Sequence, residues 1–186
     1  MNPVKISKAV EILGKDGVCI FPTDTVYGLF CSAYSKRAVS KVYGIKGRSK
    51  RKPLQLFLSD KNDIFKYAKA SPSLKTKIKK MLPGPYTVIL KLKPEYSKSF
   101  SFLKTGTAGF RVIKSSFIKS VIESLGGPVA ATSANISGHK TPVKFRDIEA
   151  AVARKTGFAV KDDKQVRGIP SKVVDFTGEK EKVLRP

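Results

Sequence analysis

The sequence predicts one α/β domain over residues 1–186, on three observations. The chain is long enough for a single domain with a real core, because a chain of 186 residues buries roughly 70% of its unfolded surface. Hydrophobic residues make up 41% of it and form short apolar runs that alternate with segments of helical periodicity. This hydrophobic content argues against a disordered chain. No apolar run approaches the roughly 20 residues that span a bilayer, so a membrane protein is not expected.

Each expected element has a local pattern behind it. Apolar residues at helical spacing predict the helices, which start at Ser or Asp caps or at an early Pro. Short apolar runs between turn residues predict the strands. The expected order is helix 3–15, strand 18–21, helix 35–45, strand 54–58, helices starting at Asp60 and at Ser71, strands 86–92 and 109–113, helix 115–125, strand 129–132, helix 147–155, and strands 171–176 and 182–184.

Glycine and proline mark where these elements end. Gly14 or Gly17 closes the first helix, and the Pro- and Gly-rich segment 82–85 stops the helix that starts at Ser71. Thr177 and Gly178 make the turn between the last two strands. Because no repeat, low-complexity block or long linker divides the chain, a single domain is expected.

The chain is strongly basic and carries few thiols and imidazoles. Its 37 Lys and Arg exceed its 14 Asp and Glu, giving a net charge of +23, which indicates attraction to polyanions. Many lysines lie where solvated faces are expected, so the charge alone locates no binding surface. Cys19 and Cys31 have no Cys-x-x-Cys partner and His139 is the only histidine, so we expect no protein-built zinc site. Without a signal-peptide apolar block, a cytoplasmic protein with reduced thiols is expected.

Two pairs of polar residues are candidates for holding an anion. Lys46 and Arg48 are two apart beyond a helix, so in an extended segment they would point to one side and grip phosphate oxygens. Ser133 and Asn135 leave a strand for a Gly-ended loop, so they could face one pocket while nearby N–H groups form an anion nest. The alternatives are an exposed basic run and an ordinary Asn/Ser turn. The Walker and dinucleotide glycine motifs are absent.

Six segments, in order, carry a resemblance to a known family. They are Phe21–Leu29, 46–48 with 52–54, 82–87, 109–112, 131–138 and 184–186. With these segments the chain resembles the YrdC-like family of threonylcarbamoyl-AMP synthases. The resemblance implies a twisted mixed sheet flanked by helices, with a basic concave surface that holds ATP and threonine. It also implies a reaction: L-threonine and bicarbonate give an N-carboxylated amino acid, which attacks the α-phosphorus of ATP and expels pyrophosphate.

The resemblance further implies roles for individual residues. A catalytic constellation would comprise Lys46, Arg48, Ser133 and Asn135. The implied ATP contacts are Arg48, Lys52, Thr107, Asn135, Val143 and Arg185. The implied threonine contacts are Thr25, Phe57, Arg111, Ser133 and Ser171. Mg²⁺ would arrive with ATP, held by phosphates and water, because no carboxylate cluster stands in the motifs, and Asp24 is interpreted as a local structural acceptor.

Two other functions stay open at the level of sequence. The net charge favours an RNA-binding module of the same fold without adenylation. Phe57, where many relatives carry histidine, favours a paralogue that adenylates a carbamoyl or acyl group; Lys52 likewise replaces a common asparagine. If the protein is a synthase, its product passes to a threonylcarbamoyl transferase complex acting on tRNA, and tRNA or another RNA could bind directly. A triad of Ser133, His139 and an acid is not expected, because the resemblance gives Ser133 a ligand-binding role.

Overall fold

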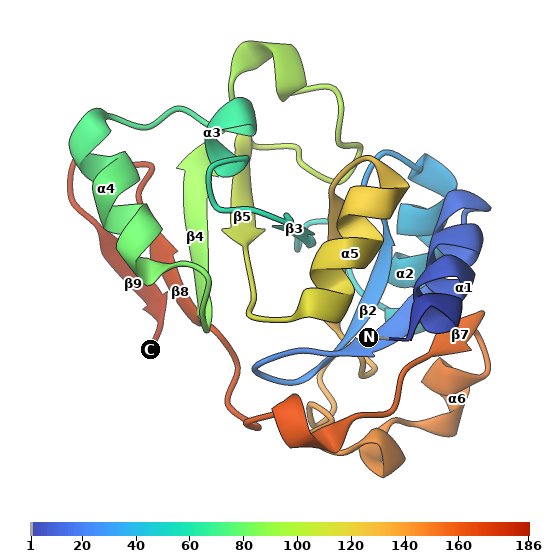
Figure 1. Cartoon of the computed structure of the whole chain (residues 1–186). Coiled ribbons are helices and arrows are strands. Elements are labelled where there is room, and N and C mark those ends of the chain that lie inside the picture. The colour runs from blue at the N-terminus through green and yellow to red at the C-terminus, as the bar shows by residue number, and fades with distance from the viewer. Residues whose placement is uncertain (1) are drawn as a thin grey trace.

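A mixed sheet with helices on both faces organises the chain (Figure 1). The computed structural model describes residues 2–186. Its strands are β1 Cys19–Pro22, β2 Tyr27–Ser32, β3 Gln55–Phe57, β4 Tyr86–Lys91, β5 Thr107–Arg111, β6 Val129–Ser133, β7 Phe158–Ala159, β8 Lys172–Asp175 and β9 Lys182–Arg185. Its helices are α1 Pro3–Gly14, α2 Lys36–Lys46, α3 Ile64–Tyr67, α4 Pro72–Met81, α5 Ser116–Leu125 and α6 Ala150–Ala153, with 3₁₀ turns at Pro94–Tyr96, Phe145–Asp147 and Asp163–Gln165.

The described residues form one sheet with the strand order β7-β1-β2-β6-β3-β5-β4-β8-β9. The pairs β1–β7, β3–β5 and β4–β8 are parallel, and the other neighbours are antiparallel. The expected α/β class and mixed sheet are therefore confirmed. Segments distant in the sequence become neighbours at the centre of the sheet, where β6 lies between β2 and β3.

Side-chain caps explain where most helices start. Ser35, Ser71 and Ser115, all expected caps, each accept a hydrogen bond from a backbone N–H in the first turn of their helix. The helix expected from Asp60 is wrong in extent. Asp60 instead accepts the backbone N–H of Asn62 at 2.7 Å, which makes a turn, and α3 is a single helical turn that starts at Ile64.

Three further differences concern short elements. β2 and β7 lie outside the expected strands. β2 contains Gly28 and the small residues Cys31 and Ser32, which weaken the usual strand pattern, and its pairing with β1 and β6 supplies the order that its own sequence lacks. The helix expected over 147–155 is reduced to a 3₁₀ turn followed by the four-residue α6.

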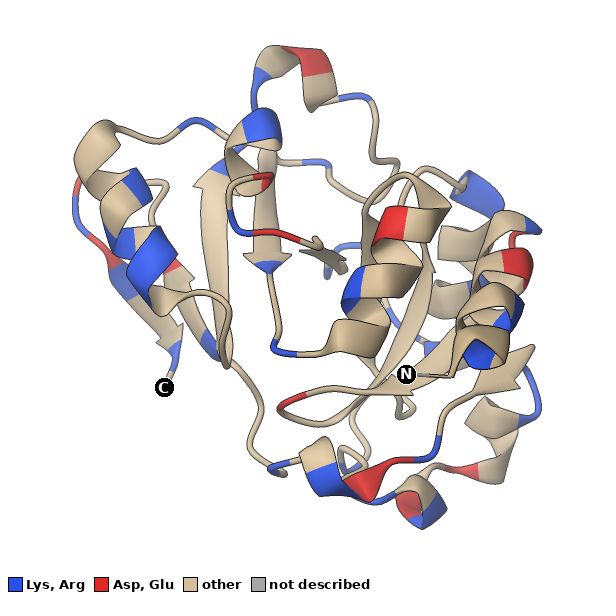
Figure 2. Cartoon of the chain, in the orientation of Figure 1, with Lys and Arg blue, Asp and Glu red and all other residues tan. Residues whose placement is uncertain are grey.

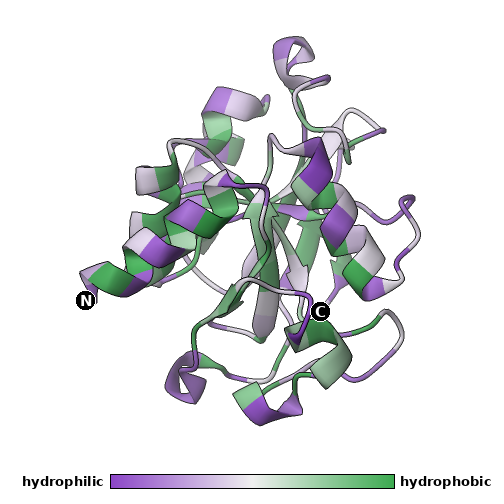
Figure 3. Ribbon diagram, turned by 90° about the vertical axis from the view of Figure 1, so that its right-hand side faces the viewer, coloured by the Kyte–Doolittle hydropathy of each residue, from purple (hydrophilic) through white to green (hydrophobic). Residues whose placement is uncertain are grey.

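Two hydrophobic clusters lie on opposite faces of the sheet, as the alternation of side chains along a strand requires. α1 and α5 pack over Phe21, Phe30 and Phe57. The cluster that contains Leu29 and Leu56 packs on the other face, with side chains of α2. Figure 3 shows hydrophobic residues along the central strands, between helices that mix hydrophobic and hydrophilic residues.

Charge and thiols add little that locates a function. Figure 2 shows Lys and Arg on most helices and loops rather than gathered over one element. Cys19 and Cys31 are buried and unpaired, and burial raises the pKa of each thiol to about 12. Both thiols are therefore protonated near neutral pH. Within residues 2–186, no helix is long and apolar enough to cross a membrane.

Candidate active site

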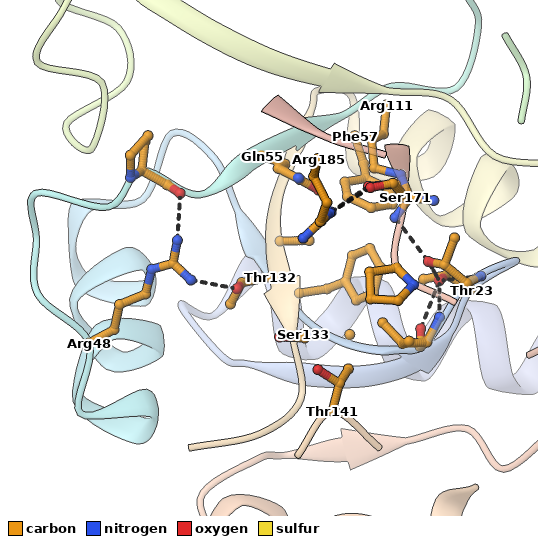
Figure 4. A pocket seen from close by; sticks show the side chains of 17 residues that line it. Thr23, Arg48, Gln55, Phe57, Arg111, Thr132, Ser133, Thr141, Ser171 and Arg185 are labelled. Atoms are coloured by element: carbon orange, nitrogen blue, oxygen red, sulfur yellow. Dashed lines mark hydrogen bonds between the residues drawn. The ribbon is translucent and has the colours of Figure 1, made fainter. Parts of the chain in front are cut away.

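A cavity of about 150 Å³ lies against one face of the sheet (Figure 4). Side chains two residues apart on three neighbouring strands contribute to it, as expected for positions that share a face. The lining residues are Thr23, Thr25, Val26, Gly28, Phe30, Arg48, Pro53, Gln55, Phe57, Arg111, Ala131, Thr132, Ser133, Thr141, Pro170, Ser171 and Arg185. Because Phe30 and Phe57 also pack in the cluster with α1 and α5, the cavity opens on that face of the sheet.

Three arginines line this cavity from distant parts of the chain. Arg48 follows α2, Arg111 is the last residue of β5, and Arg185 is the last residue of β9. Figure 4 shows Arg48 on one side, apart from Arg111 and Arg185. Guanidinium groups bind carboxylates and phosphates through paired hydrogen bonds, so the lining suits anionic ligands at two places.

Arg111 is the most deeply buried of the three, with 4% of its surface exposed. Its Nη2 donates to Asp24 Oδ1 at 2.7 Å and its Nη1 donates to Thr25 Oγ1 at 3.2 Å. The guanidinium carbon lies 5.0 Å from the centre of the Phe57 ring, and Nε has no partner in the protein. Burial lowers the pKa of Arg111 to about 10, so the side chain remains a cation at neutral pH.

Thr25 is positioned by the turn between β1 and β2. Thr23 Oγ1 donates to the Val26 carbonyl at 2.7 Å and accepts the backbone N–H of Thr25 at 3.1 Å. The Thr23 proton is then already used, so across their 2.9 Å contact the Thr25 hydroxyl is the donor. Thr25 therefore presents a lone pair to Arg111 and lines the cavity.

Lys46 differs from the geometry expected for it. It is the last residue of α2, and Gly47 ends the helix with φ 56°, so the segment is not extended as expected. Lys46 Nζ donates to the carbonyl oxygens of Ser133 and Asn135, both at 2.7 Å, and to Asn135 Oδ1 at 3.1 Å. All three ammonium protons are thereby used, and 1% of the residue is exposed. Burial lowers its pKa to about 8.

Ser133 and Asn135 do lie together, as their spacing predicts. Ser133 lines the cavity, and its Oγ donates to Asn135 Oδ1 at 2.6 Å. The anion nest expected from the following backbone is wrong for three of its N–H groups. Those of residues 134, 136 and 137 donate to the Tyr27 carbonyl, to Glu149 Oε1 and to the Lys46 carbonyl. These donors hold the loop in place and are not free for a phosphate.

Arg48 is held at the edge of the cavity by weaker contacts. Its Nε donates to the Lys52 carbonyl at 3.1 Å, its Nη2 to the Pro53 carbonyl at 3.3 Å, and its Nη1 to Thr132 Oγ1 at 3.4 Å. Arg48 is half-buried, whereas Lys52 is exposed and contributes its carbonyl, not its ammonium group, to this arrangement. The structure brings Arg48 to the cavity and leaves the Lys52 side chain outside its lining.

Ser171 and Arg185 form one wall together. Arg185 Nε donates to the Ser171 carbonyl at 2.7 Å, and its Nη2 donates to Ser171 Oγ at 2.9 Å. Thr87 Oγ1 of β4 lies 2.8 Å from Ser171 Oγ. Both hydroxyl residues are buried. Contacts between β4, β9 and the residue that precedes β8 hold this wall in place.

Two further expected ATP contacts lie outside the cavity lining. Thr107 lies at the opposite end of β5 from Arg111, roughly 13 Å along the strand at about 3.3 Å per residue, and is outside the cavity lining. Val143 is not in the lining, although Thr141, two residues before it, is. Gln55 and Thr23 are lining residues to which the resemblance gave no role. The two-residue period of β3 through Phe57 could have found Gln55, whereas Thr23 lies in the turn between β1 and β2, where that period does not apply.

His139 takes no part in a triad. Its Nδ1 lies 3.0 Å from Glu149 Oε2, and the Ser133 hydroxyl donates to Asn135 rather than to the imidazole. His139 is also exposed, on the loop beyond Asn135. Among residues 2–186, no group of three His, Cys, Asp or Glu side chains could hold a metal ion.

Comparison with known proteins identifies the family. The family model Sua5/YciO/YrdC, described as telomere recombination, matches residues 11–186. The chain belongs to the Sua5/YciO/YrdC family. The resemblance stated from six sequence segments is therefore confirmed.

Two relatives and one solved structure illustrate the similarity. A protein of Methanocaldococcus jannaschii named putative threonylcarbamoyl-AMP synthase is 34% identical over 97% of this chain and 86% of its own length. The Bacillus subtilis threonylcarbamoyl-AMP synthase is 30% identical over 100% of this chain, which spans only 54% of that protein. The crystal structure of P. abyssi Sua5 complexed with L-threonine is 29% identical, with a TM-score of 0.86 over 100% of this chain and 55% of that one.

Proposed function

We propose that this protein is a threonylcarbamoyl-AMP synthase, which makes threonylcarbamoyl-adenylate and pyrophosphate from L-threonine, bicarbonate and ATP. The observation that carries the proposal is the convergence of Arg48, Arg111 and Arg185 on one cavity. The reaction combines a nucleoside triphosphate with an amino acid carboxylated on its nitrogen, and both are anions. The names of the relatives and the threonine complex of P. abyssi Sua5 support the same function.

The amino acid is proposed to bind at the Arg111 side of the cavity. Arg111 has a buried Nε–H without a protein partner, and a substrate carboxylate would satisfy it. Thr25, Ser133 and Ser171 offer hydroxyl groups for the polar atoms of threonine. Phe57 offers an apolar ring for its methyl group, and lies beneath the Arg111 guanidinium.

The nucleotide is proposed to bind at the Arg48 side. The guanidinium of Arg48 is aimed by carbonyl oxygens and can bind phosphate oxygens, with Ser133 beside it. Lys46 would act through Ser133 and Asn135, because its own protons are used within the protein. Arg185 would approach the nucleotide from the opposite wall. The contacts of Lys52, Thr107 and Val143 with ATP rest on the resemblance alone.

In the proposed step, an oxygen of the N-carboxyl group forms a bond to the α-phosphorus. The bond from that phosphorus to the oxygen bridging to the β-phosphate breaks, and its electron pair leaves with pyrophosphate. Charge spreads over the phosphoryl oxygens in the transition state, so cations fixed in advance lower the barrier more than a protein nucleophile would. Mg²⁺ is proposed to arrive with ATP, bound by phosphate oxygens and water.

The remaining partners follow from the product. An adenylate of this kind is an activated intermediate, so a transferase complex acting on tRNA is proposed to consume it. The reaction is proposed to take place in the cytoplasm, together with the transferase step that acts on tRNA. Direct binding of tRNA or another RNA to this chain stays a proposal, supported by the net charge of +23.

The test is direct. The pure protein is incubated with ATP, Mg²⁺, bicarbonate and L-threonine, while pyrophosphate is measured and threonylcarbamoyl-AMP is identified by mass spectrometry. Serine, no amino acid and the exposed-site variant Arg154→Ala serve as controls. A threonine-dependent adenylate supports the synthase. Salt-sensitive RNA binding without any adenylate would favour the RNA-binding module, and an adenylate formed without threonine would favour the paralogue.

A further inference from the structure

Asp24 belongs to the segment that turns from β1 into β2, yet its side chain reaches another part of the molecule. Its Oδ1 accepts a hydrogen bond from Arg111 Nη2 at 2.7 Å, across 87 positions of sequence. The Arg111 side chain is 5% exposed and that of Asp24 is 18% exposed. Asp24 is therefore not the local acceptor that the sequence indicates, but the partner of a buried cation.

The surroundings of Arg111 show what this carboxylate does. Among the described residues, Asp24 is the one carboxylate in an ion pair with Arg111, whereas the other charge that faces it is the cation of Arg185. An unpaired buried cation is costly, and breaking such a pair is strongly unfavourable. Without Asp24, the Arg111 side chain would face only hydroxyl and aromatic groups and a second guanidinium.

The contacts also set the direction of the guanidinium. Asp24 holds Nη2, Thr25 holds Nη1, and the Phe57 ring lies against the planar face. These three contacts fix the group in position and rotation, and leave Nε without a partner. Asp24 itself is absent from the residues that line the cavity, so its influence passes through Arg111.

We propose that Asp24 is a positioning residue, which orients Arg111 toward the carboxylate of the amino acid substrate. This inference rests on the proposed function. Positioning and a simple charge effect predict changes of opposite sign in threonine affinity when Asp24 is neutralised. A carboxylate beside Arg111 weakens the attraction of that site for anions, so charge alone predicts tighter threonine binding once Asp24 is neutral. Positioning predicts weaker binding.

The experiment measures L-threonine and ATP binding separately by calorimetry, in the wild type and in Asp24→Asn, Asp24→Glu and Asp24→Ala. Glu95→Gln is the matched control, since Glu95 is an exposed carboxylate outside the cavity lining. For Asp24→Asn we expect threonine binding at least about tenfold weaker, with ATP binding little changed. Asp24→Glu should recover part of the loss, and formate should restore threonine binding to Asp24→Ala.

Each outcome decides the proposal. Unchanged or tighter threonine binding in Asp24→Asn would overturn it, as would equal losses for threonine and ATP that follow a lower melting temperature. A wild type that binds no threonine would overturn the proposed function and this inference together. A wild type that binds threonine, with an Asp24→Asn variant that binds it equally well, would overturn only the inference.

Discussion

Lys46 and Arg111 are both buried cations, and they use their hydrogen-bond donors differently. Lys46 is 1% exposed and gives its three protons to oxygens of the Ser133–Asn135 segment. Arg111 is 4% exposed and has a carboxylate and a hydroxyl as partners, but keeps one buried N–H free. A cation whose donors are all used supports the fold, whereas one with a donor left beside a cavity is available to a ligand.

The partners also set how strongly each charge is retained. Lys46 is surrounded by neutral oxygens, and burial lowers its pKa to about 8. Arg111 starts from a higher ordinary value and Asp24 opposes the effect of burial, so its pKa falls only to about 10. Near pH 8, Lys46 should therefore begin to lose its proton while Arg111 keeps its charge.

The largest expected effect is on catalysis, from Arg111→Met. This change removes the proposed carboxylate contact while keeping an unbranched side chain of similar length. Threonine-dependent kcat/KM should fall by about 10²- to 10³-fold, the size typical for losing an aimed donor in a closed site. The free energy of unfolding should fall by less than the activation free energy rises, because the Asp24 side chain is 18% exposed and water can reach the carboxylate that loses its partner. Steady-state kinetics and urea unfolding check this, with Arg154→Met as the control. Kinetics like those of the wild type would contradict a substrate contact at Arg111.

The next effect is on stability, from Lys46→Met. The carbonyl oxygens of Ser133 and Asn135 would lose their charged donor inside the protein, at a cost of about 1–3 kcal/mol for each unsatisfied group. For these two groups together we therefore expect the free energy of unfolding to fall by about 2–6 kcal/mol. Urea unfolding measures it, and Lys36→Met, at an exposed lysine of the same helix, is the matched control. Equal stability of Lys46→Met and Lys36→Met would contradict a structural role for Lys46.

The smallest effect is the contribution of Lys46 to the pH dependence of stability. Its folded pKa of about 8 lies below its ordinary value of 10.5, so between these values the unfolded chain binds the additional proton. The contribution of Lys46 to the free energy of unfolding should therefore rise with pH in this window, by at most about 1.4 kcal/mol per pH unit. The buried thiols of Cys19 and Cys31, whose pKa is raised, contribute in the opposite direction. Activity should fall in the same window, because a neutral amine has only two protons for three acceptors.

The difference in unfolding free energy between wild type and Lys46→Met isolates this contribution. It should increase from pH 8 to pH 9.5, while Arg111 remains largely charged. A difference that stays constant over that range would mean that Lys46 keeps its proton in the folded protein.

Sequence patterns predicted what depends on neighbouring residues. The caps Ser35, Ser71 and Ser115 lie where expected because capping involves only the first helical turn. Ser133 and Asn135 are in contact as expected, because they are only two positions apart in the sequence. The six family segments also identified Arg48 and Arg111, although no local pattern shows that they share a cavity.

Contacts across the sheet could not be predicted in the same way. Two of the three acceptors of Lys46 are backbone carbonyls, which every residue has, so no residue type reveals them. The partner of Asp24 is 87 positions away, and depends on how β1, β2 and β5 are arranged in the sheet. Gly47, between Lys46 and Arg48, adopts a left-handed conformation, whereas the expectation that these two side chains point to one side required an extended chain.

The interleaved strand order has a consequence for folding kinetics. The cavity has walls from segments between Thr23 and Arg185, and β6 must enter between β2 and β3 before Lys46 can meet Asn135. Contacts between residues so far apart in sequence require long loops to close, and the entropy of closure is lost before the contacts stabilise the chain, so they form slowly. Ligand binding should thus be the last property to return on refolding, after helical circular dichroism. Ligand binding would therefore report that all strands of the sheet are in place, which helical circular dichroism alone does not show.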